Sequence, residues 1–358
     1  MNKRNIYMDA LSILSCIAVV YLHCSTVVFV NQGDMLWFLS IIVQSLFCFA
    51  VPVFFMISGA NLIGYRAKYS TSMFLTKRVK RVVLPLVGFS FLYFALACFA
   101  PNIFGLAPRP FDLVSFGRDL LTNRICDVYW FIYSILALYL VTPLLSLAAD
   151  DKNLLQYLLV LSFASTTVIP LINRFAPTHT LLNLLAIPYV TGPIFFYLLG
   201  YYLERYVDAA AISRWLLCAS SILAVACMVF MTVRTNLSHT VVSGSFSSFD
   251  NFYINITNLP CVMVSSSLFL LFKSFEPSMR AARAFGSKAF RSLCKAPFYV
   301  YLIHMLIINT LDVYVPHRIL WDLGLRPLVV AGVAFVFALV YVGARSALTS
   351  FSRRAMAS

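Results

Sequence analysis

Two histidines that lie inside apolar runs are the first candidates for chemistry in this sequence. His23 lies deep in the first long apolar run, and His304 lies in a later one. Hydrocarbon cannot solvate an imidazolium, so an ionisable residue at such depth normally faces a protein interior or a wet cavity. A neutral imidazole suits general-base work near pH 7. His23 is therefore the candidate catalytic base, and the alternative is a histidine that only hydrogen-bonds a neighbouring helix.

The helix that carries His23 has a polar face along most of its length. At about 100° per residue, Ser12 and His23 lie about 20° apart around the axis. Asp9 and Cys16 fall on the same side. This pattern predicts a polar channel that leads to His23. Cys24 points about 100° away from His23, so we do not expect a Cys/His pair.

Four further side chains are candidates for contacts with a substrate or with a developing oxyanion. Tyr301 and His304 are three residues apart and share a helix face. Tyr129 and Trp130 open another apolar run, where such residues usually anchor a helix at the membrane interface. The alternative for this second pair is a place in the wall of an outward-facing pocket.

The composition indicates the element type that must position these residues. The chain is 61% hydrophobic and 11% charged, where soluble domains carry roughly 25% charged residues. We therefore predict an all-α polytopic membrane protein that forms one domain over residues 1–358. Apolar runs of about 20 residues can each cross a bilayer. Ten such runs are expected, at 8–30, 37–63, 82–103, 128–149, 154–172, 184–203, 212–233, 252–273, 293–312 and 326–348.

The distribution of basic residues predicts the topology. Most of the 27 Lys and Arg residues fall on inner segments if both termini are cytoplasmic. This N-in and C-in arrangement places His23 in the outer half of the bilayer and His304 near mid-depth. The net charge of +14 then meets anionic lipid, and nucleic-acid binding is not expected. Two inner clusters, 77–81 and 280–295, are dense enough to hold a phosphorylated ligand as well.

No signature of a metal site or of a permanently bound cofactor is present in the sequence. The nine cysteines are scattered, without the paired spacing of zinc sites or disulfide frameworks. Walker loops, glycine-rich dinucleotide turns, nucleophile elbows and H-E-x-x-H motifs are also absent. Pro52, within the second run, frees a backbone carbonyl and favours a kink there.

Five segments in order resemble the integral-membrane acyltransferase family 3, and the resemblance covers nearly the whole chain. The closest similarity is to the enterobacterial-common-antigen O-acetyltransferase type. Each segment alone is a weak signal, but their order and their places in the helices are fairly specific. The segments are 7–23, 51–59, 77–85, 130–145 and 301–308.

The resemblance implies a bacterial inner-membrane enzyme that moves acetyl or succinyl-like groups onto sugar hydroxyls of envelope glycans or lipid-linked sugars. Acyl-CoA would be the co-substrate and would enter from the cytoplasm. We expect His23 to act as a general base on the acceptor hydroxyl or to carry the acyl group covalently. The candidates for binding the donor phosphates are Arg78, Arg81, Arg283 and Arg291.

Two departures from the family pattern keep other functions open. Ser12 stands where the family usually has an arginine that helps to hold the donor, and serine lacks that charge. Val128 stands where the family often has a histidine. The alternatives are a transporter or flippase for a lipid-linked saccharide, and a catalytically inactive relative. An acyltransferase adds mass to the glycan, whereas a transporter moves the glycan unchanged.

Overall fold

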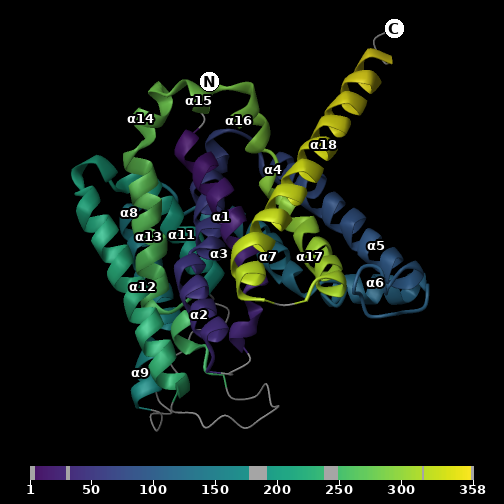
Figure 1. Ribbon diagram of the computed structural model, residues 1–358. Helices are drawn as coiled ribbons and strands as arrows, with labels where there is room; N and C mark the ends of the chain where they lie inside the picture. Colours follow the sequence, from purple (N-terminus) through teal and green to yellow (C-terminus); the bar gives the residue numbers. More distant parts are fainter. Residues whose placement is uncertain (1–4, 30–32, 177–191, 238–248, 317, 356–358) are drawn as a thin grey trace. The chain divides into compact units, whose positions relative to one another are not determined.

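A computed structural model of the protein describes residues 5–29, 33–176, 192–237, 249–316 and 318–355. The side chains of Arg283 and of residues 348–355 are outside this description. Within the described residues the chain is helical and contains no strand, which confirms the all-α prediction (Figure 1).

Nine of the described helical segments are long and apolar enough to cross a membrane. They match nine of the ten predicted spans. The tenth, 184–203, begins outside the described residues, and its described part is α11 (Gly192–Tyr206). The protein is therefore a multi-pass membrane protein, and the N-in and C-in topology stays a prediction.

The chain forms two compact units, each assembled from separate stretches of sequence. Unit 1 contains residues 1–24, 86–128 and 276–358, and unit 2 contains residues 25–85 and 129–275. The helices of unit 1 are α1 (Ile6–Cys24), α5 (Leu84–Phe99, from Leu86 onward), α6 (Leu113–Leu121), α14 (Glu276–Ala281), α15 (Arg283–Gly286), α16 (Lys288–Leu293), α17 (Pro297–Tyr314), the π-helical η9 (Leu320–Leu325) and α18 (Arg326–Ala355).

Unit 2 contains the remaining membrane-spanning helices and several single turns. Its longer helices are α2 (Met35–Phe47), α3 (Ala50–Leu62), α4 (Thr71–Arg78), α7 (Trp130–Leu145), α8 (Lys152–Phe163), α9 (Ile169–Phe175), α11, α12 (Arg214–Leu237) and α13 (Leu259–Ser274). Its short helices are η1 (Thr26–Phe29), η2 (Ile63–Ala67), η3 (Val79–Val83), η5 (Ala164–Val168), η6 (Ala209–Ala211) and η8 (Phe252–Ile254), and η4 (Asp127–Tyr129) joins the two units in sequence.

Prolines account for the irregular turns inside the spans. Pro52 has no N–H to reach the carbonyl of Cys48, and the helix is interrupted at residues 48–49 between α2 and α3. The expected distortion is therefore present one turn before the proline. The π-helical segments η3, η5 and η9 likewise directly precede or adjoin Pro85, Pro170 and Pro327.

In unit 1, α1 packs against both α17 and α18, and α17 packs against α18 (Figure 1). A core cluster joins these three helices through Val20, Cys24, Ile308, Val330 and Ala331. The side chain of Cys24 is thus used in apolar packing. This arrangement puts the C-terminal end of α1, where His23 lies, directly beside the middle of α17.

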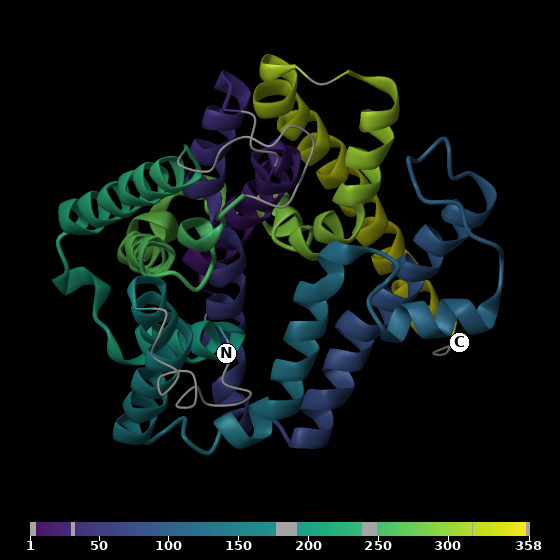
Figure 2. The same ribbon diagram turned by 90° about the horizontal axis from the view of Figure 1, so that it is seen from below.

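In unit 2, α11 packs along α3 and α12 packs along α13 (Figure 2). The α3–α11 contact is very close. A Cβ atom at Gly59 would lie 1.8 Å from the Tyr197 carbonyl oxygen, and one at Gly200 would lie 2.1 Å from the Met56 carbonyl oxygen. Only glycine fits at these two positions, as is common where membrane helices meet backbone to backbone.

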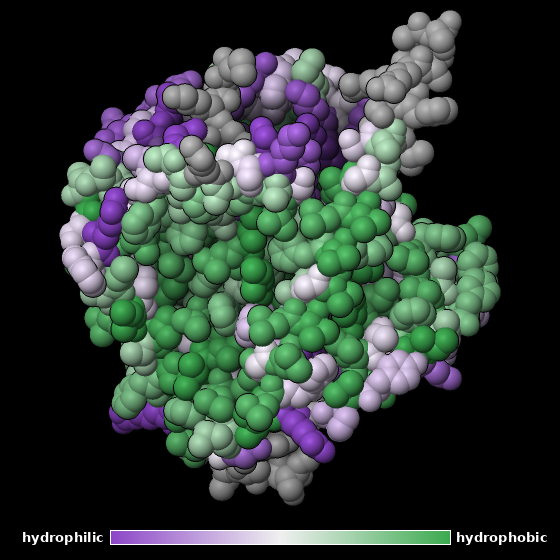
Figure 3. Space-filling view, turned by 45° about the horizontal axis from the view of Figure 1, so that its top comes forward, coloured by the Kyte–Doolittle hydropathy of each residue, from purple (hydrophilic) through white to green (hydrophobic). Residues whose placement is uncertain are grey.

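The surface has the character expected of lipid-facing helices. Apolar side chains cover most of the face seen in Figure 3. Large exposed apolar residues occur on helices of both units, for example Leu140, Leu223 and Val340. A soluble protein rarely exposes so much contiguous apolar surface.

Candidate active site

His23 and His304 lie side by side within unit 1. Their ring centroids are 5.2 Å apart, and the ring planes are inclined by 40°. His23 is in the last turn of α1 and is partly exposed, whereas His304 is near the middle of α17 and is fully buried. The sequence singled out both residues, and the fold brings them together. Of the two residues, His23 alone has exposed surface, because His304 is completely buried.

The backbone of α17 fixes the proton on the His304 ring. Nδ1 of His304 lies 2.7 Å from the carbonyl oxygen of Tyr301. A carbonyl oxygen only accepts hydrogen bonds, so Nδ1 carries the hydrogen in the neutral ring. Nε2 then carries the free lone pair. In this tautomer Nε2 can accept a hydrogen bond or a proton.

That lone pair has no hydrogen-bond partner among the described residues. Nε2 of His304 is buried and unpaired. A buried polar atom without a partner costs about 1–3 kcal/mol, and in native proteins it commonly marks a functional group. Two serine hydroxyls of unit 1 share this condition, Ser15 on α1 and Ser90 on α5. The interior of unit 1 therefore contains several buried polar atoms without a hydrogen-bond partner among the described residues.

Tyr301 is the third aromatic ring of this cluster. Its ring centroid is 5.4 Å from that of His304. Its hydroxyl is buried and donates a hydrogen bond to the carbonyl oxygen of Val128. This bond uses the O–H of Tyr301, which is the single donor of its side chain. A hydrogen bond from Tyr301 to an oxyanion would therefore require breaking the bond to Val128. Val128, which stands where the family often has histidine, thus contributes its backbone to the His304 surroundings.

Several contacts fix α1 and α17 around the histidine pair. The carboxylate of Glu276 accepts hydrogen bonds from the backbone N–H groups of Ile6 and Tyr7, at 3.1 and 2.7 Å, and so caps the start of α1. Further along, the Cys16 thiol donates to the carbonyl of Pro297 at 3.5 Å. The sequence did not indicate this cap, because Glu276 and the start of α1 are far apart along the chain.

The predicted polar face of α1 has a mixed character. Asp9 and Ser12 are partly buried, whereas Cys16 is buried against α17. Ser15, which the helical projection did not select, is the fully buried hydroxyl of this helix. A channel along Asp9, Ser12 and Cys16 stays a prediction.

A buried arginine that the sequence analysis did not select lies at the start of α18. Arg326 is 3% exposed and forms ion pairs with Asp312 and with Asp322, the latter at 3.1 Å. Two carboxylates around one guanidinium satisfy a charge that would otherwise be very costly to bury. Packing of α1 against α18 and η9 brings this network into the same unit as His23. An arginine at the very start of an apolar run was the signal that was available in the sequence.

The remaining predicted residues are distributed over both units. Tyr129 is buried and Trp130 is exposed, and both belong to unit 2. The guanidinium of Arg78, also in unit 2, stacks over Phe74 and Tyr139 at 5.4 and 5.5 Å.

Of the other arginines predicted to bind the donor, Arg81 is exposed in unit 2, and Arg291 is exposed on α16 in unit 1. The side chain of Arg283 lies outside the described residues. Among the described residues no group of His, Cys, Asp and Glu side chains is arranged to hold a metal ion.

Comparison with known proteins gives one match. Residues 5–345 match the family described as acyltransferase domain, which covers nearly the whole chain and both units. Neither the curated proteins nor the solved structures gave a match. The matched region contains His23, His304, Tyr301 and Val128. The chain therefore belongs to the acyltransferase family 3 and is a membrane acyltransferase.

Proposed function

We propose that this protein is a membrane O-acyltransferase of the bacterial inner membrane. It transfers an acetyl or succinyl-like group from cytoplasmic acyl-CoA to a sugar hydroxyl of an envelope glycan or a lipid-linked saccharide. The observation that carries the proposal is the His23–His304 pair, with its 5.2 Å centroid separation and the unpaired Nε2 of His304. The sequence resemblance to the enterobacterial-common-antigen type of O-acetyltransferase supports a sugar acceptor.

The two histidines have different roles in this proposal. His23 is the general base, because it alone of the two is accessible. His304 is a positioning residue: its Nε2, unpaired in the structure, would accept the N–H of His23 once the two rings reorient, and would leave the other nitrogen of His23 as the proton acceptor. A base oriented by a further hydrogen-bonding group is the arrangement found in many acyl-transfer enzymes.

The reaction then proceeds as a direct acyl transfer. The sugar hydroxyl loses its proton to His23 as its oxygen attacks the thioester carbonyl of acyl-CoA. The tetrahedral intermediate collapses with cleavage of the carbon–sulfur bond, and the CoA thiolate takes the proton from His23. The products are an O-acyl sugar and free CoA, and His23 returns to its neutral form. General-base catalysis of this kind typically contributes about 10²–10⁴-fold to the rate.

The donor would be recognised by basic side chains on the inner loops. CoA carries several phosphate groups, and arginine binds phosphate through charge-assisted hydrogen bonds. Arg81 and Arg291 are exposed and are the strongest candidates. Arg78 already stacks on two aromatic rings and is better placed to support its helix. Membrane lipids are the other expected partners.

The proposed function is tested by glycan mass in an expression host that lacks its own acyltransferase. Cells that express the wild-type chain should show envelope glycans heavier by one acyl group per modified sugar, and cells that express His23→Gln should not. Size-exclusion chromatography in detergent checks that the variant is folded and present in equal amount. Glycans without added mass in wild-type cells, with a changed distribution across the membrane, would support the transporter instead.

A further inference from the structure

A cavity of about 340 Å³ lies in unit 1, between the outer part of α5, the segment after it and the second half of α17. Its volume is at the lower end of the about 300–1,000 Å³ typical of small-molecule sites. Tyr93 and Phe94 line it from α5, and Met305 and Asn309 line it from α17. Arg124 and Asp127 complete its polar lining.

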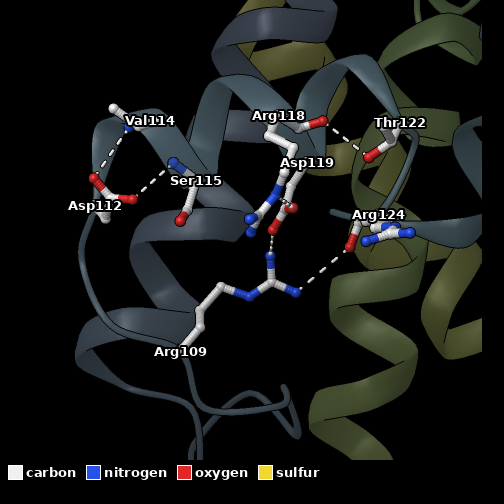
Figure 4. Close-up of polar contacts among 8 residues, drawn as sticks. All are labelled: Arg109, Asp112, Val114, Ser115, Arg118, Asp119, Thr122 and Arg124. Atoms are coloured by element: carbon white, nitrogen blue, oxygen red, sulfur yellow. Dashed lines mark hydrogen bonds and ion pairs between the residues drawn. The ribbon is translucent and has the colours of Figure 1, made fainter.

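The lining of this cavity carries a small excess of positive charge. Arg109, which lines it, pairs with Asp119 at 3.0 Å, and Asp119 also pairs with Arg118 at 3.2 Å (Figure 4). Arg109 also donates to the carbonyl of Arg124 at 3.4 Å. Of the charged lining groups, Arg109 and Arg124 are positive and Asp127 is negative. One excess charge is little for a polyanion, and the lining favours a hydrogen-bonding ligand.

Three polar side chains of the lining have no partner among the described residues. The amide of Asn309, the guanidinium of Arg124 and the carboxylate of Asp127 form no side-chain hydrogen bond or ion pair there. Together with the aromatic rings of Tyr93 and Phe94, they combine apolar faces with several donors and acceptors. Sugars present the matching surface, because their rings have apolar C–H faces and hydroxyls around the edge.

The walls of the cavity are fixed to the helix that carries His304. Gly105, in the lining segment, has a φ of +58°, and a Cβ there would lie 2.7 Å from the Asn309 carbonyl oxygen. The hydroxyl of Tyr93 accepts a hydrogen bond at 2.8 Å from the backbone N–H of Leu306. The site is therefore preformed, which lowers the entropic cost of binding.

The cavity also adjoins the histidine cluster. Val128 lines it and accepts the hydroxyl of Tyr301, whose ring lies beside that of His304. Met305 follows His304 directly in α17. Tyr301 thus links a residue of the cavity lining to the histidine pair.

We propose that this cavity is the part of the acceptor site that holds a short, neutral saccharide next to the reacting sugar, since neither histidine lines it. The proposal rests on the proposed function, since it identifies the substrate class of the same site. Arg124, Asp127 and Asn309 hold the hydroxyls, and Tyr93 and Phe94 provide the apolar floor. Arg109 does not bind the sugar; it fixes the segment that carries Arg124.

The first test measures binding without any need for catalysis. Ala107→Cys places a thiol in the lining, and Thr122→Cys places one at the C-terminal end of α6, outside the lining. Both positions are exposed. Alkylation of each new thiol by N-ethylmaleimide is followed by peptide mass spectrometry on the full-length protein in nanodiscs. A panel of neutral trisaccharides of glucose, mannose and N-acetylglucosamine serves as the probe, and inorganic phosphate serves as the anionic competitor.

We expect at least one trisaccharide to slow the alkylation of Ala107→Cys several-fold and to leave Thr122→Cys unchanged. If no trisaccharide changes the Ala107→Cys rate, the proposal is wrong. Protection by phosphate alone also overturns it, because that result identifies an anion site.

The second test uses the acylation assay. Asn309→Ala and Arg124→Ala should each raise the KM for the acceptor about tenfold with little change in kcat, since each removes hydrogen bonds to bound substrate. Arg318→Ala is the matched control, because Arg318 is exposed and lies outside the lining.

Failure of the proposed subsite and failure of the proposed acyl transfer give different results. Acylation with unchanged KM values in the two lining variants would reject the subsite and leave the proposed function intact. Saccharide protection of Ala107→Cys in a protein that acylates nothing would support the subsite and reject the acyl transfer.

Discussion

His23 at the end of α1 and His304 in the middle of α17 lie in ring contact, with centroids 5.2 Å apart, although they come from opposite ends of the chain. The contact pairs a partly exposed imidazole with a fully buried one. The Nδ1 atom of the buried ring is engaged by the Tyr301 carbonyl, so its Nε2 is free to accept. In the proposed function, this asymmetry is the reason for making His23 the base and His304 the positioning residue.

The positioning role of His304 predicts a specific kinetic effect. His304→Gln should lower kcat by about 10-fold to 100-fold, less than the loss for His23→Gln, because the base remains but loses its orienting partner. The KM values for donor and acceptor should stay close to those of the wild type. The pH dependence of kcat should shift as well, and a purely structural role would leave that profile in place. Steady-state kinetics over a range of pH check this outcome.

The hydrogen bond from Tyr301 to Val128 predicts a stability effect. Tyr301→Phe removes the donor and leaves a buried carbonyl without its partner. The free energy of unfolding should fall by about 1–3 kcal/mol, seen as a lower melting temperature in detergent. Tyr314→Phe is the control, because Tyr314 is 63% exposed at the end of the same helix. Equal melting temperatures for the two variants would contradict the assigned contact.

The close contact between α3 and α11 predicts that alanine is not tolerated at Gly200. The new Cβ would lie 2.1 Å from the Met56 carbonyl oxygen, so one helix backbone must move. Overpacking of this kind costs about 1–3 kcal/mol or more. Gly88→Ala is the matched control on α5, because a Cβ there meets nothing within 4 Å. Its melting temperature should equal or exceed that of the wild type, since alanine favours helix.

The thiol of Cys126, in the cavity lining, predicts an unusual pH profile for alkylation. Burial raises the pKa of Cys126 from 9.0 to about 12. Only the thiolate reacts, so a raised pKa means that the protonated, unreactive form persists to higher pH. Alkylation by iodoacetamide should remain slow near neutral pH and should still be rising at about pH 10, where ordinary cysteines have reached their plateau. A plateau at about pH 9 in peptide mass spectrometry would show that the thiol is not buried.

The sequence predicted the helical class and the spans well, because lipid imposes a length and a composition on every crossing helix. It also singled out His23 and His304, because an ionisable side chain in an apolar run is conspicuous. It could not predict that they meet, because a single sequence contains no information on which helices are neighbours.

Other features of the site were beyond sequence reasoning for similar reasons. The Glu276 cap of α1 and the Val128 acceptor of Tyr301 are contacts between residues far apart in sequence. The unpaired Nε2 of His304 depends on ring orientation, which only the packed structure fixes. Arg326 was visible as a charge at the start of an apolar run, but its two aspartate partners explain it as part of a structural ion-pair network.

The central claim, that His23 is the base for acyl transfer, is tested most directly by a single-turnover measurement. Purified protein in nanodiscs is mixed with acetyl-CoA labelled in the acetyl group and with the unmodified host glycan, and label on the glycan is followed in time. We predict transfer by the wild-type protein and a rate at least about 100-fold lower for His23→Gln, with the same melting temperature and the same acetyl-CoA binding. Transfer by folded His23→Gln at the wild-type rate would contradict the account.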